Sequence, residues 1–308
     1  MHGEARHEAG SEFKRAGPDF LEQAYASDPR LGRCFDVLAY HPYAYPFTAP
    51  ELPVPARGSV LSAAGQMRAV LRRHGGGRVP LWITEVGWPT SGGYGVSEAK
   101  QAQYVARMQS ATFAEGVPVL AWYAYGDVPD PTGANQEAHF GFFRADGSAK
   151  PAYAALRTFD LVFAGARFVA DRSRALGLPA ARTLLDGGGY ALTYRTRRAA
   201  ITALWLADES AAEGQGPLPP GGNASPPATA VRLPVTSRRV TVMSYLGTRR
   251  RLVARRGVVE LRLGPGPMYV IDPHRRPRAV TPGARLERSA VHGMRGRLPR
   301  GRRHRAAD

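Results

Sequence analysis

The sequence has 308 residues, 44% of them apolar, and a formal net charge of +17. This length and composition are typical of a globular protein with one large core or two smaller ones, and they exclude a fibrous or fully disordered chain. No apolar run approaches the roughly 20 residues needed to cross a bilayer. Met1 to Gly10 carries charges where a secretory signal has its apolar core. We therefore expect no membrane span and no signal peptide, and the sequence leaves the localisation unknown.

The positive charge is concentrated at the carboxyl end. Residues 274–308 contain 11 arginines against two acidic residues, a net charge of +9. Because this segment is rich in Pro and Gly and poor in large apolar residues, we expect a disordered tail. Its arginines are not interleaved with aromatic residues, so the tail predicts no specific nucleic-acid site.

Cys34 is the single cysteine, which excludes an internal disulfide and a cysteine-based metal site. Free cysteine commonly behaves as a small buried hydrophobe, so we expect a buried structural thiol at the start of an apolar strand. His7-Glu8 does not begin a zinc-binding helix, because Ser11 stands where the second His is needed. We expect no metal and no cofactor.

Short apolar runs and amphipathic segments alternate along the first half of the chain. We predict buried strands over Cys34–Tyr40, Pro80–Val86 and Val117–Tyr125. We predict helices over Asp19–Ala26, Leu61–His74, Ser97–Glu115 and Lys150–Phe159. Ser97 is the expected cap of its helix. Alternation of strands with helices predicts a parallel sheet.

The second half of the chain has a different sequence pattern. From about Thr183, short alternating segments separated by Gly and Pro predict an antiparallel sheet or sandwich. These segments are Tyr190–Tyr194, Ala199–Leu206, Ala230–Leu233, Arg239–Tyr245, Val258–Leu263 and Met268–Ile271. We expect residues 214–227 to form a loop inside this region. The predicted organisation is a polar segment over 1–17, an α/β region over 18–162, a β-domain over 183–273 and the tail over 274–308.

Polar and aromatic side chains follow all three predicted parallel strands. The strands end in Tyr40-His-Pro-Tyr-Ala-Tyr-Pro46, Thr84-Glu-Val-Gly-Trp-Pro89 and Trp122-Tyr-Ala-Tyr-Gly-Asp127. Because parallel strands present their carboxyl ends at one rim, a carboxylate, an imidazole and several aromatic rings converge there. Sugar rings stack on aromatic faces and their hydroxyls need polar partners, so this mixture favours a carbohydrate cleft. Glu85 continues a buried strand face, where a carboxylate is costly unless paired or functional; the alternative is a glutamate that reaches solvent or an arginine.

Thr84-Glu85-Val-Gly-Trp88, after its apolar strand, resembles the nucleophile strand of retaining (β/α)8-barrel glycoside hydrolases, in particular the cellulase-like and β-xylosidase-like families. Asp36-Val-Leu-Ala-Tyr-His41-Pro-Tyr43 is similar to the sixth strand of that clan, and Leu120-Ala-Trp122-Tyr123 to the eighth. His139 to Tyr153, with its Lys150-Pro-Ala-Tyr, is similar to the closing turn and last helix. The resemblance spans roughly residues 18–160 and is less specific in the β-domain.

The resemblance implies a fold and a set of roles. The fold is α/β, the carboxy-terminal portion of a (β/α)8 barrel with about three strand-helix units, followed by a small antiparallel β-domain. Glu85 is implied as the nucleophile in the hydrolysis of β-linked glycosides with retention, and His41, Tyr43, Trp122 and Trp88 as carbohydrate-binding residues. Ordinary packing of an aromatic strand end is the alternative for these four.

The sequence departs from the family pattern in one respect. The family places its acid/base glutamate after an Asn on the fourth strand, but Asn135 and Asn223 are the only asparagines and neither precedes Glu. A complete barrel needs eight strand-helix units, and only the last three are recognisable. We therefore expect a truncated gene model, a pseudogene remnant, or a half that pairs with a separately encoded partner supplying the missing barrel half, with impaired hydrolysis in the chain as written. The alternative function is an inactive carbohydrate-binding or interaction remnant.

Overall fold

The structure is a computed structural model that describes residues 17–43, 47–52, 59–180, 186–208 and 229–274. The predicted N-terminal segment, the loop over 214–227 and almost all of the Arg-rich tail lie outside the described residues.

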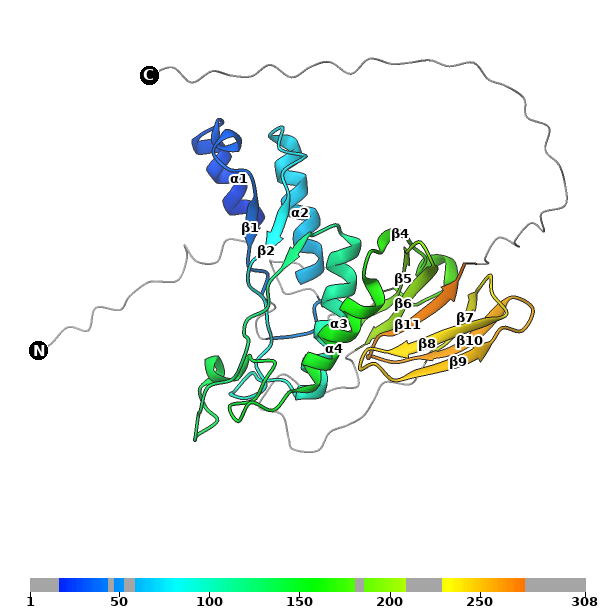
Figure 1. Ribbon diagram of the computed structural model, residues 1–308. Coiled ribbons are helices and arrows are strands. Elements are labelled where there is room, and N and C mark those ends of the chain that lie inside the picture. Colours follow the sequence, from blue (N-terminus) through cyan, green and yellow to red (C-terminus); the bar gives the residue numbers. More distant parts are fainter. Residues whose placement is uncertain (1–16, 44–46, 53–58, 181–185, 209–228, 275–308) are drawn as a thin grey trace, which may run out of the picture. The chain divides into compact units, whose positions relative to one another are not determined.

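Helices and short parallel strands alternate along the first half, as predicted (Figure 1). The helices are α1 (Gly17–Ser27), α2 (Val60–Arg73), α3 (Glu98–Ala114) and α4 (Pro151–Phe163), with short 3-10 turns η2 (Leu31–Arg33) and η3 (Gln136–His139). The strands are β1 (Leu38–Tyr40), β2 (Leu81–Ile83) and β3 (Val119–Leu120). They form a parallel sheet in the order β1-β2-β3. Each predicted strand is longer than the stretch of residues that pairs in the sheet.

Side-chain caps begin the two longest helices. The hydroxyl of Ser59 accepts a hydrogen bond from the Ser62 N–H at 3.0 Å, and that of Ser97 accepts one from the Lys100 N–H at 3.2 Å. Each satisfies one of the amide groups that a helix start leaves without a partner. The prediction for Ser97 is confirmed.

Cys34 corrects one expectation. It is exposed and lies at the end of η2, not in a strand. Its Sγ lies 3.9 Å from the carbonyl oxygen of Arg30, within the same turn. The backbone at Cys34 is still helical, so the paired strand begins only at Leu38 and the thiol is left outside the core.

The second half is antiparallel. Its strands are β4 (Arg167–Asp171), β5 (Asp186–Arg195), β6 (Ala199–Asp208), β7 (Thr229–Pro234), β8 (Arg239–Ser244), β9 (Arg249–Val253), β10 (Val258–Leu263) and β11 (Met268–Pro273), with the turn η4 (Arg174–Leu176). Six of them form a sheet in the order β4-β5-β6-β11-β8-β9, and β10 pairs with β7. Strands β4 and β9 were not predicted, because most of their residues are exposed and neither strand has more than three consecutive apolar residues.

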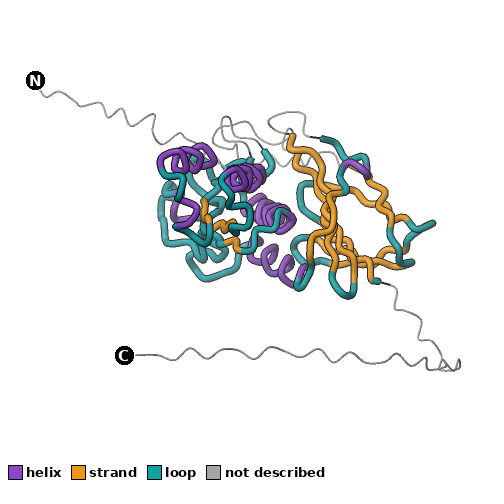
Figure 2. The backbone as a smooth tube through the Cα atoms, turned by 90° about the horizontal axis from the view of Figure 1, so that it is seen from above, coloured by secondary structure: helices purple, strands orange, loops and turns teal. Residues whose placement is uncertain are grey.

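The six-stranded sheet is covered on both faces near its centre. Val231, Leu233 and Leu261 of the β7-β10 pair belong to one apolar cluster with Leu204 and Val242 of the larger sheet. On the opposite face, Phe159 and Phe163 of α4 pack in a cluster with Tyr194, Ile201 and Trp205. In Figure 2 some of the helices lie between the short parallel strands and the long antiparallel strands. Among the described residues, no helix has the length and apolar character to span a membrane.

A buried ion pair joins α3 to the antiparallel region. The Arg107 and Glu51 side chains are fully buried, with 3.6 Å between guanidinium nitrogen and carboxylate oxygen. The Trp205 indole N–H donates to Glu51 at 2.7 Å, and Arg107 donates to the carbonyl of Pro265 at 2.8 Å. These contacts connect residues that are far apart in the sequence, so the helical and antiparallel regions share one polar anchor.

Candidate functional site

Glu85 lies just beyond the carboxyl end of β2. Leu81 and Ile83 of the strand are fully buried, whereas the Glu85 side chain is 37% exposed. The Tyr43 hydroxyl, which follows β1, donates a hydrogen bond to one Glu85 oxygen at 2.5 Å. The Nδ1 atom of His41 lies 3.4 Å from the other oxygen. Each carboxylate oxygen therefore has its own neighbour from the adjacent strand end.

His41 and Tyr43 are held on the side of Glu85 by further contacts. The Nε2 atom of His41 lies 3.0 Å from the hydroxyl oxygen of Thr84. The ring of Tyr43 packs edge-on against Phe47 and Phe140. Burial, together with the hydrogen bond to Glu85, raises the pKa of Tyr43 well above its ordinary value. Tyr43 is therefore a neutral hydrogen-bond donor to the carboxylate at all physiological pH values.

The segments after β2 and β3 run side by side and bring Tyr123 to the same rim. The Tyr123 N–H donates to the Val86 carbonyl at 2.9 Å. A Cβ atom on Gly87 would lie 1.9 Å from the carbonyl oxygen of Tyr123, so only glycine allows this approach. The loop after β3 therefore depends on the absence of a side chain two residues beyond Glu85.

The raised pKa of Tyr123 indicates a second carboxylate near the site, that of Glu137 in η3, which was not predicted from the sequence. Burial raises the pKa of Tyr123, and the charge of Glu137, its hydrogen bond with Tyr123 and the charge of Glu85 raise it further. Both carboxylates also act on Tyr43. The sequence offered one signal for Glu137, its place in the loop after the third parallel strand, because such loops carry functional residues.

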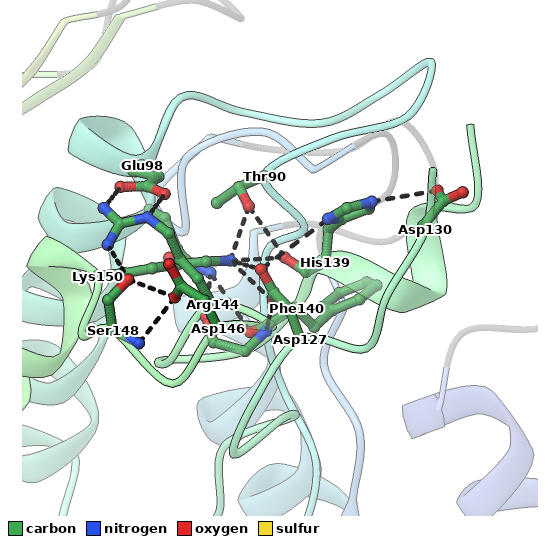
Figure 3. Close-up of polar contacts among 12 residues, drawn as sticks. Thr90, Glu98, Asp127, Asp130, His139, Phe140, Arg144, Asp146, Ser148 and Lys150 are labelled. Carbon is green, nitrogen blue, oxygen red and sulfur yellow. Dashed lines mark hydrogen bonds and ion pairs between the residues drawn. The ribbon is translucent and has the colours of Figure 1, made fainter. Parts of the chain in front are cut away.

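A buried lysine organises the loop that carries η3 (Figure 3). The Lys150 ammonium pairs with Asp127 at 2.7 Å and donates to the Thr90 hydroxyl at 2.8 Å. It also donates to the carbonyl of His139, whose ring contacts Asp130. Burial lowers the pKa of Lys150, while the Asp127 carboxylate opposes that shift. This network fixes the backbone on both sides of η3.

The outer part of the same loop is fixed by Arg144. Its guanidinium pairs with Glu98 at the start of α3 and donates to the hydroxyl of Ser148 at 3.0 Å (Figure 3). A guanidinium that meets both oxygens of a carboxylate is a geometrically specific pair. Among the described residues there is no group of His, Cys, Asp or Glu that could hold a metal ion.

Known proteins match this chain in structure and not in sequence. No protein-family model matches the sequence, and no curated protein matches it as a relative. Among solved structures, the fold superposes with a TM-score of 0.62 on a family 39 glycoside hydrolase from Bacteroides cellulosilyticus WH2, at 18% identity, covering 83% of this chain and 49% of that one. The chain has the fold of part of a glycoside hydrolase.

Weaker matches are to other glycosidases. A glucosidase from Croceicoccus marinus gives a TM-score of 0.49 at 12% identity, covering 82% of this chain and 57% of that one. A monomeric β-xylosidase from Caulobacter crescentus CB15 gives 0.47 at 12% identity, covering 84% and 60%. The family 39 enzyme, of which this chain spans about half the length, superposes better than either. The resemblance predicted from the sequence is confirmed at the level of the fold.

Within this glycoside hydrolase fold, the two predicted tryptophans differ. Trp122 is partly exposed and packs against Phe142 at a ring-centroid distance of 5.8 Å. Trp88 is only 1% exposed, and its indole N–H donates to the carbonyl of Thr48 at 2.8 Å. A buried ring offers no face to a sugar, so the predicted binding role of Trp88 is corrected to a core role beneath Trp122, 6.3 Å away.

Other aromatic side chains are open to solvent along the loop after β3. Tyr125 is 81% exposed and packs on Phe143 at 5.0 Å between ring centroids. With Asp127 and Arg144 among their neighbours, these rings line a hollow of about 570 Å³. The fold thus presents the carboxylate of Glu85 after β2 and exposed aromatic faces on the loop after β3.

Proposed function

We propose that the chain is part of a retaining glycoside hydrolase, the carboxy-terminal portion of a (β/α)8 barrel, with Glu85 as the nucleophile. The observation that carries the proposal is the hydrogen bond from Tyr43 to Glu85, which joins the ends of two neighbouring parallel strands. A nucleophilic carboxylate has to be ionised and held in position, and a neutral phenol donor supplies both conditions.

In the proposed reaction, one oxygen of Glu85 attacks the anomeric carbon of a β-linked glycoside as the bond to the leaving oxygen breaks. The leaving oxygen takes a proton from an acid/base residue, and water later releases the sugar from Glu85. We assign this acid/base role to none of the residues that the structure describes, and general-acid help contributes about 100-fold to 10,000-fold. We assign Glu137 and Tyr123 to sugar hydroxyls, since the charges of Glu137 and Glu85 both raise the pKa of Tyr123.

Trapping of the covalent intermediate tests this proposal. A 2-deoxy-2-fluoro β-glycoside with a dinitrophenolate leaving group needs no proton donor, so it can react with a nucleophile whose acid partner is absent. The xyloside and the glucoside are incubated with the full chain, and peptide mass spectrometry locates the adduct. We expect one adduct, on Glu85, and none in Glu85→Gln.

The matched control is Glu115→Gln. Glu115 lies before the amino end of β3, and its carboxylate pairs with Arg68 at 3.6 Å. This variant loses the same charge at the other end of the sheet and is expected to label like the unchanged chain. An adduct on another residue, or one that persists in Glu85→Gln, contradicts the assignment.

The second candidate is a noncatalytic carbohydrate-binding remnant. The observation that favours it is that the chain spans about half of the family 39 enzyme while retaining exposed aromatic rings. Binding of xylan or glucan, lost on Trp122→Ala and accompanied by no adduct on Glu85, is the result that selects this alternative.

A further inference from the structure

The β8-β9 hairpin carries an unbalanced positive charge. Residues 238–256 contain seven arginines and no Asp or Glu. All seven are exposed: Arg238, Arg239, Arg249, Arg250, Arg251, Arg255 and Arg256. This charge lies on two paired strands and their flanks, and it adds to the charge of residues 274–308.

The described part of the chain supplies no ion-pair partner to the arginines of this hairpin. Elsewhere, surface arginines meet carboxylates, as in Arg73 with Glu22 at 2.6 Å and Arg232 with Glu260 at 3.8 Å. Among the residues that the structure describes, none of the seven hairpin arginines forms an ion pair. Asp272, which follows β11 residue Ile271, is buried and accepts hydrogen bonds from Thr236 at 2.7 and 2.9 Å. The charges therefore remain available to an external anion.

Two of these arginines lie on one face of the sheet around a hydroxyl. Thr241 of β8 is directly opposite Arg251 of β9 and beside Ile271 of β11. Arg239 lies two residues before Thr241 and so on the same face. Diagonal neighbours of this kind are within reach of long side chains, so one anion between the two guanidinium groups can pair with both.

The same residues line a hollow of about 250 Å³. Its lining combines Arg239, Arg251 and Thr241 with Ile271 and Pro273. The guanidinium forks match the two oxygens of a carboxylate, the hydroxyl can bond a sugar hydroxyl, and the apolar wall can receive the CH face of a sugar ring. We infer that this hollow is a second carbohydrate site, which binds the carboxylate of a uronic acid in an acidic polysaccharide.

Protection of a sheet edge and binding of nucleic acid each account for the charge of the hairpin but not for the hollow around Thr241. Charges on an edge strand such as β9 discourage pairing with other sheets, but that protection needs charge alone and is met equally by lysine. The seven arginines would also suit the phosphates of a nucleic acid, but phosphate contacts make no use of the aliphatic wall of this hollow. The choice of a glycan as the ligand rests on the proposed function, but the site does not use Glu85.

Affinity electrophoresis of the full chain tests this site with polygalacturonate, neutral galactan and duplex DNA at about 0.15 M ionic strength. We expect retardation by polygalacturonate alone. In R239Q/R251Q the affinity should fall roughly tenfold or more, as expected for the loss of charge-assisted hydrogen bonds. R239K/R251K keeps the charge, and we expect it to recover less than half of the binding free energy lost, because lysine cannot form the bidentate fork.

The matched control is R72Q/R78Q, which removes two exposed positive charges from the end of α2 and the turn beyond it. We expect less than a twofold change in this variant. Equal weakening in the control and hairpin variants, full recovery by lysine, or tighter binding of DNA than of polygalacturonate overturns the inference. Labelling of Glu85 is unaffected in every one of these variants if both proposals hold. If labelling of Glu85 fails while the arginine variants behave as expected, the proposed function is contradicted and this site is not.

Discussion

The parallel and antiparallel strands of this protein are secured in different ways. Strands β1 to β3 pair over only two or three residues each, whereas β5 and β6 pair along most of their ten residues. The antiparallel sheet holds its register through this ladder and through apolar clusters on both faces. The parallel strands hold their carboxyl ends in place through individual polar contacts, such as the hydrogen bond from Tyr43 to Glu85 and the ion pair of Lys150 with Asp127. The candidate site is therefore more sensitive to single polar or steric changes than the sheet beside it.

The largest expected effect is on the anchor between the two regions. Arg107→Met leaves the carboxylate of Glu51 buried without its cation, which typically costs about 3–5 kcal/mol. Urea unfolding measures the loss. The control is Arg157→Met on exposed α4 surface, where we expect a change within about 0.5 kcal/mol. Equal stability of the two variants would show that the anchor contributes nothing.

The next effect concerns the close approach of the two loops. Gly87→Ala places a Cβ against the carbonyl of Tyr123, and we expect a loss of about 3 kcal/mol together with loss of labelling at Glu85. Gly65→Ala is the opposite case, because nothing lies within 4 Å of a Cβ at that helical position. We expect it to stabilise α2 by about 0.5–1 kcal/mol. Thermal unfolding compares them, and a neutral Gly87→Ala would contradict the predicted clash.

A smaller effect is expected when the hydrogen-bond donor to Glu85 is removed without a change in packing. Tyr43→Phe keeps the ring against Phe140 but removes the donor, so we expect labelling of Glu85 to slow about tenfold to 100-fold. The control Tyr153→Phe removes a hydroxyl from a ring that packs on Phe143 in the neighbouring loop. Intact mass spectrometry measures the rate of labelling in both variants. Equal rates would exclude a role for the Tyr43 hydroxyl.

The smallest expected effect is a pH dependence in the loop before η3. Hydrogen bonds from Thr132, the Asn135 N–H and His139 lower the pKa of Asp130 to about 2 from 3.8. Asp130 therefore contributes stability that is fully present above pH 4 and is lost as pH falls toward 2. Asp130→Asn should show a shallower decline of Tm across this interval. Parallel curves for the two proteins would contradict this contribution.

Local patterns predicted the elements well where they were long and apolar. The helices α2 and α3 and the strands β6 and β10 follow from residue spacing and capping, because such preferences act within a few residues. The ends of the parallel strands were less predictable. An apolar run continues into the loop after Leu120, and only the position of the neighbouring strand decides where pairing stops.

The sequence by itself determined the kind of fold and the place of Glu85 among aromatic strand ends, since alternation and motif are properties of neighbouring residues. Tertiary structure alone decided that Trp88 is buried, that the charge of Glu137 acts on Tyr123, and that Arg239 and Arg251 share a hollow. Each of these facts depends on contacts between residues distant in the chain, whose burial and charge are set by packing and cannot be obtained from local pattern.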